Sequence, residues 1–345
     1  MKKNLLIIGK GDTDYNDRNP KRFFDNAKNN FFDVKRCDYE ELKKLDNFHG
    51  DNLNVMLFFP YTFWNNHCER LDDDLLYGTS KKIYTSLDNF FNNFKFSLEK
   101  KFSDKNINYI INPLNATFDR DKIGVVESLL KNDISTTNII RSRNLNEILD
   151  QVSEDSGVFI KCRYGAEGKG ITVLYKDKWF TNYKVDENNL GNYGVYDKWV
   201  FSDITNRNDL VQSLLDNEVI VEKEIVNPNF YDGKKFDIRA YVINHEVPHF
   251  FVRFNDKEKI VTNYSQGAKI LHNPDTGLRK DYVQNIKNLA LDVANSLDSK
   301  FLGVDIMIDK DKVSRVVEVQ TFTDFPDIHK FNLANYVFEK SNLFR

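Results

Sequence analysis

The sequence lacks the cysteine pattern and the long apolar runs that would point outside the cytoplasm. Its 345 residues contain three cysteines, Cys37, Cys68 and Cys162, an odd number without metal-ligand spacing. The longest apolar runs, such as residues 55–60, fall far short of the ~20 residues that span a bilayer. Two N-terminal lysines lead directly into LLIIG, without the longer apolar run and cleavage site of a signal peptide. We therefore expect a cytoplasmic protein with no membrane partner.

An excess of positive charge is also missing. Lys and Arg number 49 against 52 Asp and Glu, and the net charge of −3 is spread along the chain. This balance gives no electrostatic footprint for a nucleic acid, so we expect no nucleic-acid partner. Aromatic residues, by contrast, are abundant, with 28 Phe and 16 Tyr. The length suffices for two or three domains with large, aromatic-rich cores.

The first hundred residues read as a small α/β domain. Strand-like segments at 4–9, 31–37 and 54–59 alternate with helical patterns, which is typical of a parallel sheet. The sequence Gly9-Lys10-Gly11 lacks the third glycine of a dinucleotide fingerprint. The aromatic loop PYTFWNNHCER follows the third strand, and ligands bind beyond the carboxyl ends of such strands, so this loop is a candidate substrate wall. We place the end of this domain at residue 112, before Pro113.

A glycine-rich loop lies between two predicted strands. The first strand ends on Lys161, the loop carries Gly165, Gly168 and Gly170, and the second strand begins at Ile171. Such a hairpin tip exposes backbone N–H groups and can close over phosphates, with Lys161 as the point charge beneath it. It is not a Walker loop, because the Gly-Lys-Ser/Thr ending and the following helix are absent. A flexible hairpin turn without a ligand is the alternative.

The segment KFDIRAYV, residues 235–242, alternates with period two. Phe236, Ile238, Ala240 and Val242 form the apolar face of a strand. Lys235, Asp237, Arg239 and Tyr241 share the opposite face. Two cations and a carboxylate in a row suit a phosphorylated ligand and its metal. A solvated face whose charges pair with one another is the competing interpretation.

Residues 303–320 predict a β-hairpin with two carboxylates on one face. A two-residue turn at Asp311-Lys312 would place Asp305 opposite Glu318, with Gln320 on the same face and no cation in the pattern. Oxygen ligands of this kind, together with substrate phosphates, are how proteins hold Mg²⁺. An exposed acidic hairpin is the alternative. The core-facing residues expected from this register are Val304, Ile306, Val317 and Val319.

The order of these elements resembles the ATP-grasp superfamily. The lysine-tipped strand, the Gly-rich flap, the acidic hinge, KFDIR, the Thr-Asn loop and the D…E-x-Q hairpin follow one another as they do there. NPNFYDGKKFDIRAYVI and TNYS are most similar to tubulin tyrosine ligase, and GVDIMID to the glutamate ligases of ribosomal protein tails. The resemblance covers residues 113 to about 330. It implies an α/β (α+β) fold with a Rossmann-like domain at 1–112 and ATP-grasp subdomains at 113–220 and 221–345.

The resemblance also implies a role for each matching position. By this resemblance the flap glycines, Lys122 and Lys161 would contact the phosphates of ATP. The adenine would be held by Glu222, Lys223, Glu224 and Ile225. The nucleotide and the acyl phosphate are lined by Lys235, Asp237 and Arg239, assisted by Arg253, with Thr262 and Asn263 beside the ribose and phosphates. Magnesium falls to Asp305, Glu318 and Gln320, the last of which stands where the superfamily usually has asparagine.

The expected activity is therefore that of an ATP-dependent carboxylate–amine ligase. ATP would convert a carboxylate into an acyl phosphate, and an amine would then form the amide. The expected ligands are ATP, Mg²⁺, an acid and an amine, and the sequence does not identify the last two. A phosphotransferase that stops after phosphorylation is one alternative. A nucleotide-binding module without chemistry is the other, and Gln320 is the only argument for it.

Overall fold

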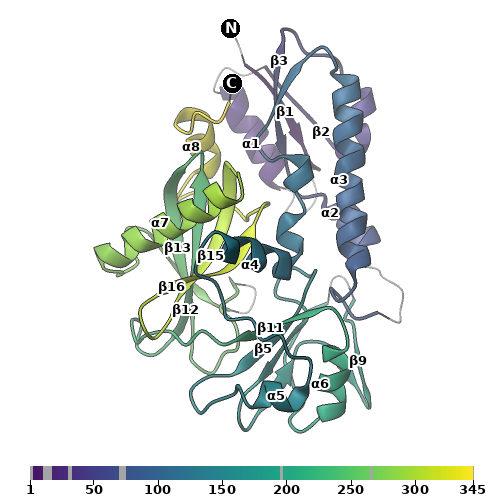
Figure 1. Cartoon of the computed structure of the whole chain (residues 1–345). Helices are drawn as coiled ribbons and strands as arrows, with labels where there is room; N and C mark the ends of the chain where they lie inside the picture. The colour runs from purple at the N-terminus through teal and green to yellow at the C-terminus, as the bar shows by residue number, and fades with distance from the viewer. Residues whose placement is uncertain are drawn as a thin grey trace.

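The structure of the chain is a computed structural model that describes residues 3–10, 18–29, 33–69, 75–194, 197–264 and 267–344. Three larger sheets follow one another along the chain; in Figure 1 the first is at the top, the second at the bottom, and the third lies between them. The first is parallel and the next two are antiparallel. This arrangement confirms the predicted α/β class, with a parallel-sheet domain ahead of two antiparallel ones. Gly11 of the Gly9-Lys10-Gly11 sequence lies outside the described residues.

The N-terminal sheet has the strand order β2-β1-β3-β4. Its strands are β1 (Asn4–Ile8), β2 (Asp33–Cys37), β3 (Asn52–Leu57) and β4 (Asn106–Tyr109). Helices α1 (Arg18–Asn29), α2 (Tyr61–His67) and α3 (Lys81–Lys101) connect them. Helix α3 buries a residue at every third or fourth position from Ile83 to Leu98, the spacing of a single helix face. The candidate substrate wall at residues 60–70 follows β3, and the prediction of a loop there is wrong, because residues 61–67 form helix α2; Arg70 lies outside the described residues.

The central sheet has the order β10-β7-β6-β5-β11. Its strands are β5 (Val158–Cys162), β6 (Ile171–Leu174), β7 (Trp179–Thr181), β10 (Ser202–Asp203) and β11 (Val219–Lys223). Strands β5 and β6 are the predicted pair around the Gly-rich loop. Helices α5 (Leu145–Leu149) and α6 (Asn208–Leu215) and the small hairpin β8 (Lys184–Asp186) and β9 (Asn189–Gly191) complete this part.

The C-terminal sheet has the order β14-β13-β12-β15-β16. Its strands are β12 (Lys235–Ile243), β13 (Glu246–Asn255), β14 (Lys269–His272), β15 (Phe301–Ile308) and β16 (Ser314–Gln320). Helices α7 (Lys280–Ser296) and α4 (Lys122–Lys131) share one apolar core with this sheet. Phe236, Ile238, Ala240 and Val242 face that core, as their period-two alternation predicts.

The last helix, α8 (Leu333–Glu339), returns to the N-terminal part of the chain. Figure 1 shows α8 beside α1, with both chain ends at the same end of the molecule. Phe338 contacts Phe23 edge-to-face, and Lys3 Nζ donates to the Phe344 carbonyl at 2.8 Å. The boundaries at 112 and 220 remain predictions; β11 runs across the second of them.

A histidine pair, His249 buried and His272 half-buried, predicts a pH-dependent stability. His249 Nε2 lies 3.1 Å from His272 Nδ1, and its ring stacks on Phe331. Burial, aided by His272, lowers the pKa of His249 to about 4. Below pH 6.5 this histidine is therefore protonated in the unfolded chain but stays neutral in the folded chain. The free energy of unfolding therefore decreases as the pH falls from 6.5 towards 4. Urea unfolding should show about 2 to 3 kcal/mol lost between pH 7 and 4.5.

The matched variant is His249→Phe, which keeps the aromatic stack and removes the titrating group. Its loss of stability over the same pH range should be smaller than that of the wild type. His329→Gln changes an exposed histidine and serves as the control, with the wild-type pH dependence. Equal pH dependence in His249→Phe and in the wild type would remove this pair as the cause.

Candidate active site

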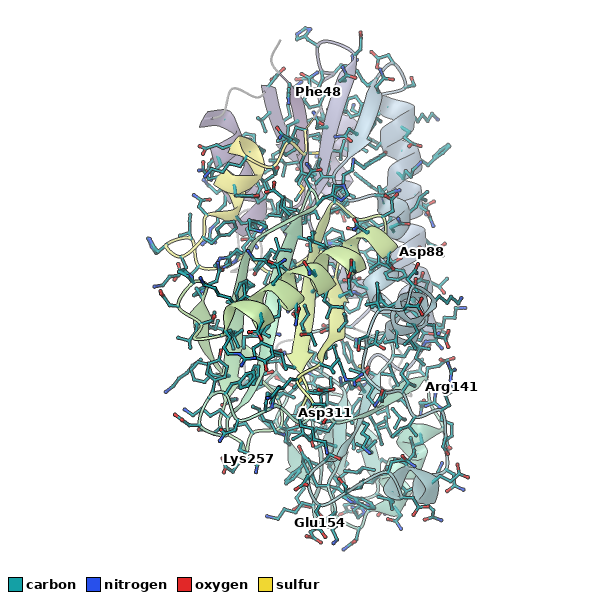
Figure 2. All side chains as sticks on the ribbon, turned by 60° about the vertical axis from the view of Figure 1, so that its left-hand side comes forward. Phe48, Asp88, Arg141, Glu154, Lys257 and Asp311 are labelled. Carbon is teal, nitrogen blue, oxygen red and sulfur yellow. The ribbon has the colours of Figure 1, made fainter. Side chains whose placement is uncertain are left out.

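A cleft of about 1370 Å³, open to solvent, lies between the central and C-terminal sheets. In Figure 2 the turn that carries Asp311, at the end of β15 and β16, points toward the part of the molecule that ends at Glu154. All but four of the predicted site residues line this cleft. They are Lys122, Lys161, Gly168, Glu222, Lys223, Glu224, Ile225, Lys235, Asp237, Arg253, Thr262, Asn263, Asp305 and Glu318. Gly165, Gly170, Arg239 and Gln320 are not part of the lining.

The central-sheet wall carries a lysine–glutamate pair. Strand β11 pairs antiparallel with β5, and Lys161 Nζ forms an ion pair with Glu222 Oε2 across them. The other oxygen of Glu222 accepts a hydrogen bond from the Thr137 hydroxyl at 2.7 Å. The Glu222 side chain is buried, so the lysine and the hydroxyl together compensate the loss of its hydration.

A second lysine–glutamate pair joins the two sheets. Lys235, at the start of β12, donates to Glu224 Oε1 at 2.8 Å and to the Tyr175 hydroxyl at 3.0 Å. Glu224 Oε2 accepts from the backbone N–H of Gly157 at 2.8 Å. Burial opposes the charge of Lys235, but Glu224 and Tyr175 outweigh it and raise its pKa. Lys235 is therefore a fixed cation at the cleft rather than a proton donor at neutral pH.

Two arginines and two aspartates form a buried network on the KFDIR face. Arg253 on β13 donates to both oxygens of Asp237 and also to Asp305 Oδ2 at 3.0 Å. Arg239 on β12 forms a bidentate ion pair with Asp305 and donates a hydrogen bond to the Thr323 hydroxyl at 3.3 Å. The competing interpretation of a solvated charged strand face is wrong, because Asp237, Arg239, Arg253 and Asp305 are all buried.

The network fixes the charge of its members. Burial opposes ionisation of Asp305, yet Arg239 and Arg253 hold its pKa below the usual value. Burial raises the pKa of Asp237 even though Arg253 pairs with it. Arg253 stays charged, since Asp237 and Asp305 raise its pKa against the effect of burial. The sequence pattern of the β15–β16 hairpin has no cation on this face, and the arginines that neutralise Asp305 come instead from β12 and β13.

The β15–β16 hairpin has the predicted pairing of Asp305 with Glu318, but its turn differs from the predicted two-residue turn. Asp305 lies opposite Glu318, but the turn is longer than two residues: Asp309 N–H donates to the Val313 carbonyl at 2.9 Å. Lys312 takes the positive φ of 67° that such three-residue turns use. This turn shifts the register by one residue, and a bulge between the Asp305 and Ile306 pairs restores it.

The bulge changes which valines are in the core. All three valines touch the cleft, but only Val316 and Val319 join the apolar core of the C-terminal sheet, and Val317 stays outside it. The prediction that Val317 faces the core is therefore wrong. Glu318 lies 3.8 Å from Lys122 Nζ, its nearest cation. Gln320 pairs with Gly303, two residues beyond Glu318 on β16, and stays outside the lining.

The glycines of the flap have different neighbours from those expected. An added Cβ on Gly165 would lie 2.2 Å from Cys162 Sγ, and one on Gly170 would lie 2.7 Å from it. Any side chain at either position would therefore clash with this sulfur. Gly168, with φ of +70°, is the one that faces the cleft, against Asn263. Lys122 Nζ donates to the Gly165 carbonyl at 2.5 Å and anchors the loop from below.

The flap is also attached to the N-terminal part of the chain. Lys169 Nζ donates to Glu69 at 2.9 Å, and the Ala166 N–H donates to the Tyr77 hydroxyl at 3.1 Å. Lys169 lines the cleft, and nothing in the sequence distinguished it, because Glu69 is 100 residues away.

Other lining residues were missed although a signal existed. Phe159 lies two residues before Lys161 on β5, and Met307 lies two residues after Asp305 on β15. Alternation along a strand places each on the cleft face. Ile260 and Val261 precede the predicted Thr262-Asn263 pair, whose neighbours Ser265 and Gln266 lie outside the described residues. These apolar side chains give the cleft a surface on which a flat ring can pack.

Two antiparallel sheets that enclose lysines, a glycine-rich flap and a carboxylate hairpin define the class of ATP-grasp proteins. A family model described as YheC/D-like ATP-grasp matches residues 110–331. The match covers more than half of the chain, which therefore belongs to the YheC/D-like ATP-grasp family. The narrower resemblance to tubulin tyrosine ligase is not supported by this match.

A curated relative supports the same superfamily over a shorter segment. The alpha-aminoadipate–LysW ligase LysX of Saccharolobus solfataricus is 32% identical over 115 residues. The matched segment spans 32% of this chain and 39% of LysX, so well under two-thirds of that protein is covered.

Solved structures match over almost the whole chain. The ATP-grasp ligase PsnB, complexed with a phosphomimetic variant of its minimal precursor, Mg and ADP, has a TM-score of 0.59 at 11% identity, covering 97% of this chain and 96% of PsnB. The macrocyclase MdnC, bound with precursor peptide MdnA from Microcystis aeruginosa MRC, has a TM-score of 0.58 at 11% identity, with coverages of 98% and 99%. D-alanine–D-alanine ligase from Bacillus anthracis, complexed with ATP, has a TM-score of 0.51 at 14% identity, with coverages of 93% and 87%. These similarities establish the fold.

Within the described ranges, no helix is both long and apolar enough to cross a bilayer.

Proposed function

We propose that the chain is an ATP-dependent carboxylate–amine ligase that works through an acyl phosphate. The observation that carries the proposal is the cleft itself. One continuous lining brings together five lysines, an arginine and the paired carboxylates of the hairpin. The family assignment and the ligase names of LysX, PsnB and D-alanine–D-alanine ligase support it.

ATP is proposed to lie along the cleft from the hinge to the hairpin. The base would pack between apolar side chains such as Phe159 and Met307, beside the hinge residues 222–225. Thr262 and Asn263 would bind the ribose and the phosphates from the flap side. Lys122, Lys161 and Lys235 would meet the phosphates. Each of these lysines now contacts a carboxylate or a carbonyl, so ATP binding has to compete with those contacts.

The residues of the hairpin fit a magnesium ion. Magnesium is held in proteins by one or two carboxylates plus substrate phosphates, and Asp305 and Glu318 offer two carboxylates on one lining. In the described residues no group of three or more His, Cys, Asp or Glu gathers into a larger metal site. Glu318 and Asp305 would therefore hold the ion, Asp305 sharing its oxygens with Arg239 and Arg253, and Gln320 would need a side-chain rearrangement to reach it. The ion would neutralise negative charge on the phosphates.

Catalysis by the chain would rest on positioning and charge. Lys161 and Arg253 line the cleft and would stabilise the negative charge that develops on the transferred phosphoryl group. Arg239 lies behind Asp305 and would act at the acyl phosphate while holding that carboxylate in place. No nucleophilic side chain is required, because the substrate carboxylate and the amine supply the attacking atoms.

Product analysis tests the proposal against its two alternatives. Pairs of acids and amines are screened for ADP and phosphate release with ATP and Mg²⁺, and the products are identified by mass spectrometry. A ligase gives an amide only when both substrates are present. A stable phosphorylated acid without an amine would establish the phosphotransferase, and bound ATP without ADP in every mixture would establish a nucleotide-binding module.

A further inference from the structure

A groove separates the open edge of the N-terminal sheet from the C-terminal part of the chain. Its free volume is about 590 Å³. One wall is an unbroken run of six residues, 107–112, which contains the end of β4 and the residues after it. The other wall includes the turn after α7, residues 296–300. Side chains alternate between the two faces of a strand, so a lining by consecutive residues means that the edge of β4 faces the groove.

The backbone of β4 has unpaired groups on this edge. Strand β4 pairs in parallel with β3, and the N–H groups of Asn106 and Ile110 donate to carbonyl groups within β3 and just before it. The even-numbered residues of β4 therefore face β3. Backbone groups of successive residues point to opposite sides of a strand, so those of Ile107 and Tyr109 point into the groove. Within the described residues β4 is the last strand of its sheet and has no second neighbouring strand.

The two edges of this sheet differ in their protection against pairing with another chain. The outer strand β2 has the sequence Asp-Val-Lys-Arg-Cys, and charged side chains on an edge strand discourage such pairing. Strand β4 has the sequence Asn-Ile-Asn-Tyr, with neither a charged residue nor a proline. It pairs with β3 in one register over all four residues, without a bulge. The features that usually keep an edge strand unpaired are therefore present on β2 and absent from β4.

The charge and the shape of the groove indicate its occupant. Among the described lining residues only Asp298 and Lys300 are charged, and more than half of the others carry an amide or a hydroxyl group. This neutral lining gives no electrostatic attraction for a nucleic acid or an anionic membrane. A second copy of the chain would bring a whole sheet into the plane of β4, where the turn after α7 occupies the other side of the groove. A single extended segment meets no such obstruction.

We propose that the edge of β4 binds an extended, mainly uncharged peptide segment of a partner protein by strand addition. The peptide forms the next strand of the N-terminal sheet, and its backbone pairs with the free groups of Ile107 and Tyr109. At about 3.3 Å per residue, the six-residue wall accommodates roughly six residues of peptide. Apolar side chains of the peptide contact Phe118 and Leu297. The inference is independent of the ligase function, because the groove shares none of its described lining residues with the nucleotide cleft.

Peptides with methylated backbones test the strand pairing without a change to the protein. The full chain is screened against an array of acetylated, amidated six-residue peptides with Ser, Thr, Val or Asn at each position. The tightest binder is then methylated on the backbone nitrogens of its even or of its odd residues. Only alternate N–H groups of a strand face its neighbour, so one pattern should lower the affinity about tenfold and the other should leave it unchanged. Equal effects of both patterns, or an array without any binder, would overturn the inference.

Proline variants test the same contact from the side of the protein. Ile107→Pro removes an N–H group that faces the groove, which an edge strand tolerates, and should bind the peptide about tenfold more weakly than Ile107→Ala, which keeps that group. Val34→Pro makes the matching change on the outer edge of β2 and should bind like the wild type. Hydrogen exchange should show new protection of the Ile107 and Tyr109 amides in the complex.

Two results contradict the assignment of this edge. Equal peptide affinities of Ile107→Pro and Ile107→Ala would show that the backbone of β4 does not take part. A wild-type dimer that Ile107→Pro dissociates, measured by analytical ultracentrifugation, would assign the edge to a second copy of the chain instead of a peptide.

Discussion

Lys161→Met is expected to weaken ATP binding by about 10- to 100-fold and to reduce ADP formation below detection. Lys161 lines the cleft beneath the flap, and a charge-assisted bond to a phosphate is worth about 1.5 to 3 kcal/mol. Methionine keeps the length of the side chain and removes its charge. Calorimetry with an ATP analogue measures the affinity, and a coupled assay measures ADP release.

The substitution also leaves Glu222 without its cation, so a loss of stability has to be separated from a loss of binding. Glu222 keeps the hydrogen bond from Thr137, and the double variant Lys161→Met, Glu222→Gln removes the unpaired charge altogether. It should recover the melting temperature and not the ATP affinity. Lys176→Met, an exposed lysine just beyond β6, is the matched control. Wild-type affinity in Lys161→Met would exclude this lysine from the nucleotide site.

The features that the sequence predicts well are those with a local pattern. The alternation of KFDIRAYV separates the core residues of β12 from Asp237 and Arg239 without any knowledge of neighbouring strands. The flap hairpin is recognisable from its glycines between two short strands. The apolar partners Phe159 and Met307 follow the same alternation and were within reach of the same argument.

The features that were missed depend on which strands become neighbours. Arg253 faces Asp305 only because β12 pairs with both β13 and β15, and this order is invisible in the sequence. The bulge at Val317 offsets the longer turn, so the pairing of Asp305 with Glu318 was predicted from an incorrect turn. Lys169 meets Glu69, which follows helix α2 in the N-terminal part of the chain. In each case the contact joins segments that a periodicity argument treats separately.

Glu318→Gln is expected to abolish magnesium-dependent ADP formation and to leave the fold intact. Glu318 lines the cleft and is half-exposed, and its nearest cation, Lys122, lies 3.8 Å away. Glutamine keeps the size and removes the charge that an Mg²⁺ ligand supplies. The melting temperature should stay near the wild-type value, because Asp305 is already neutralised by Arg239 and Arg253 and no repulsion is relieved. ADP affinity with and without Mg²⁺ gives a readout independent of turnover, and the gain from Mg²⁺ should disappear.

Asp305→Asn is the contrasting variant on the same hairpin. It leaves two buried arginines without a full counter-charge, so we expect a loss of about 3 to 5 kcal/mol of stability as well as of activity. Glu127→Gln, on the exposed face of α4 beside Arg141, is the control and should change neither property. Full magnesium-dependent turnover in Glu318→Gln would show that the hairpin is only an acidic edge of the cleft, because a glutamine cannot replace the charge of a carboxylate ligand.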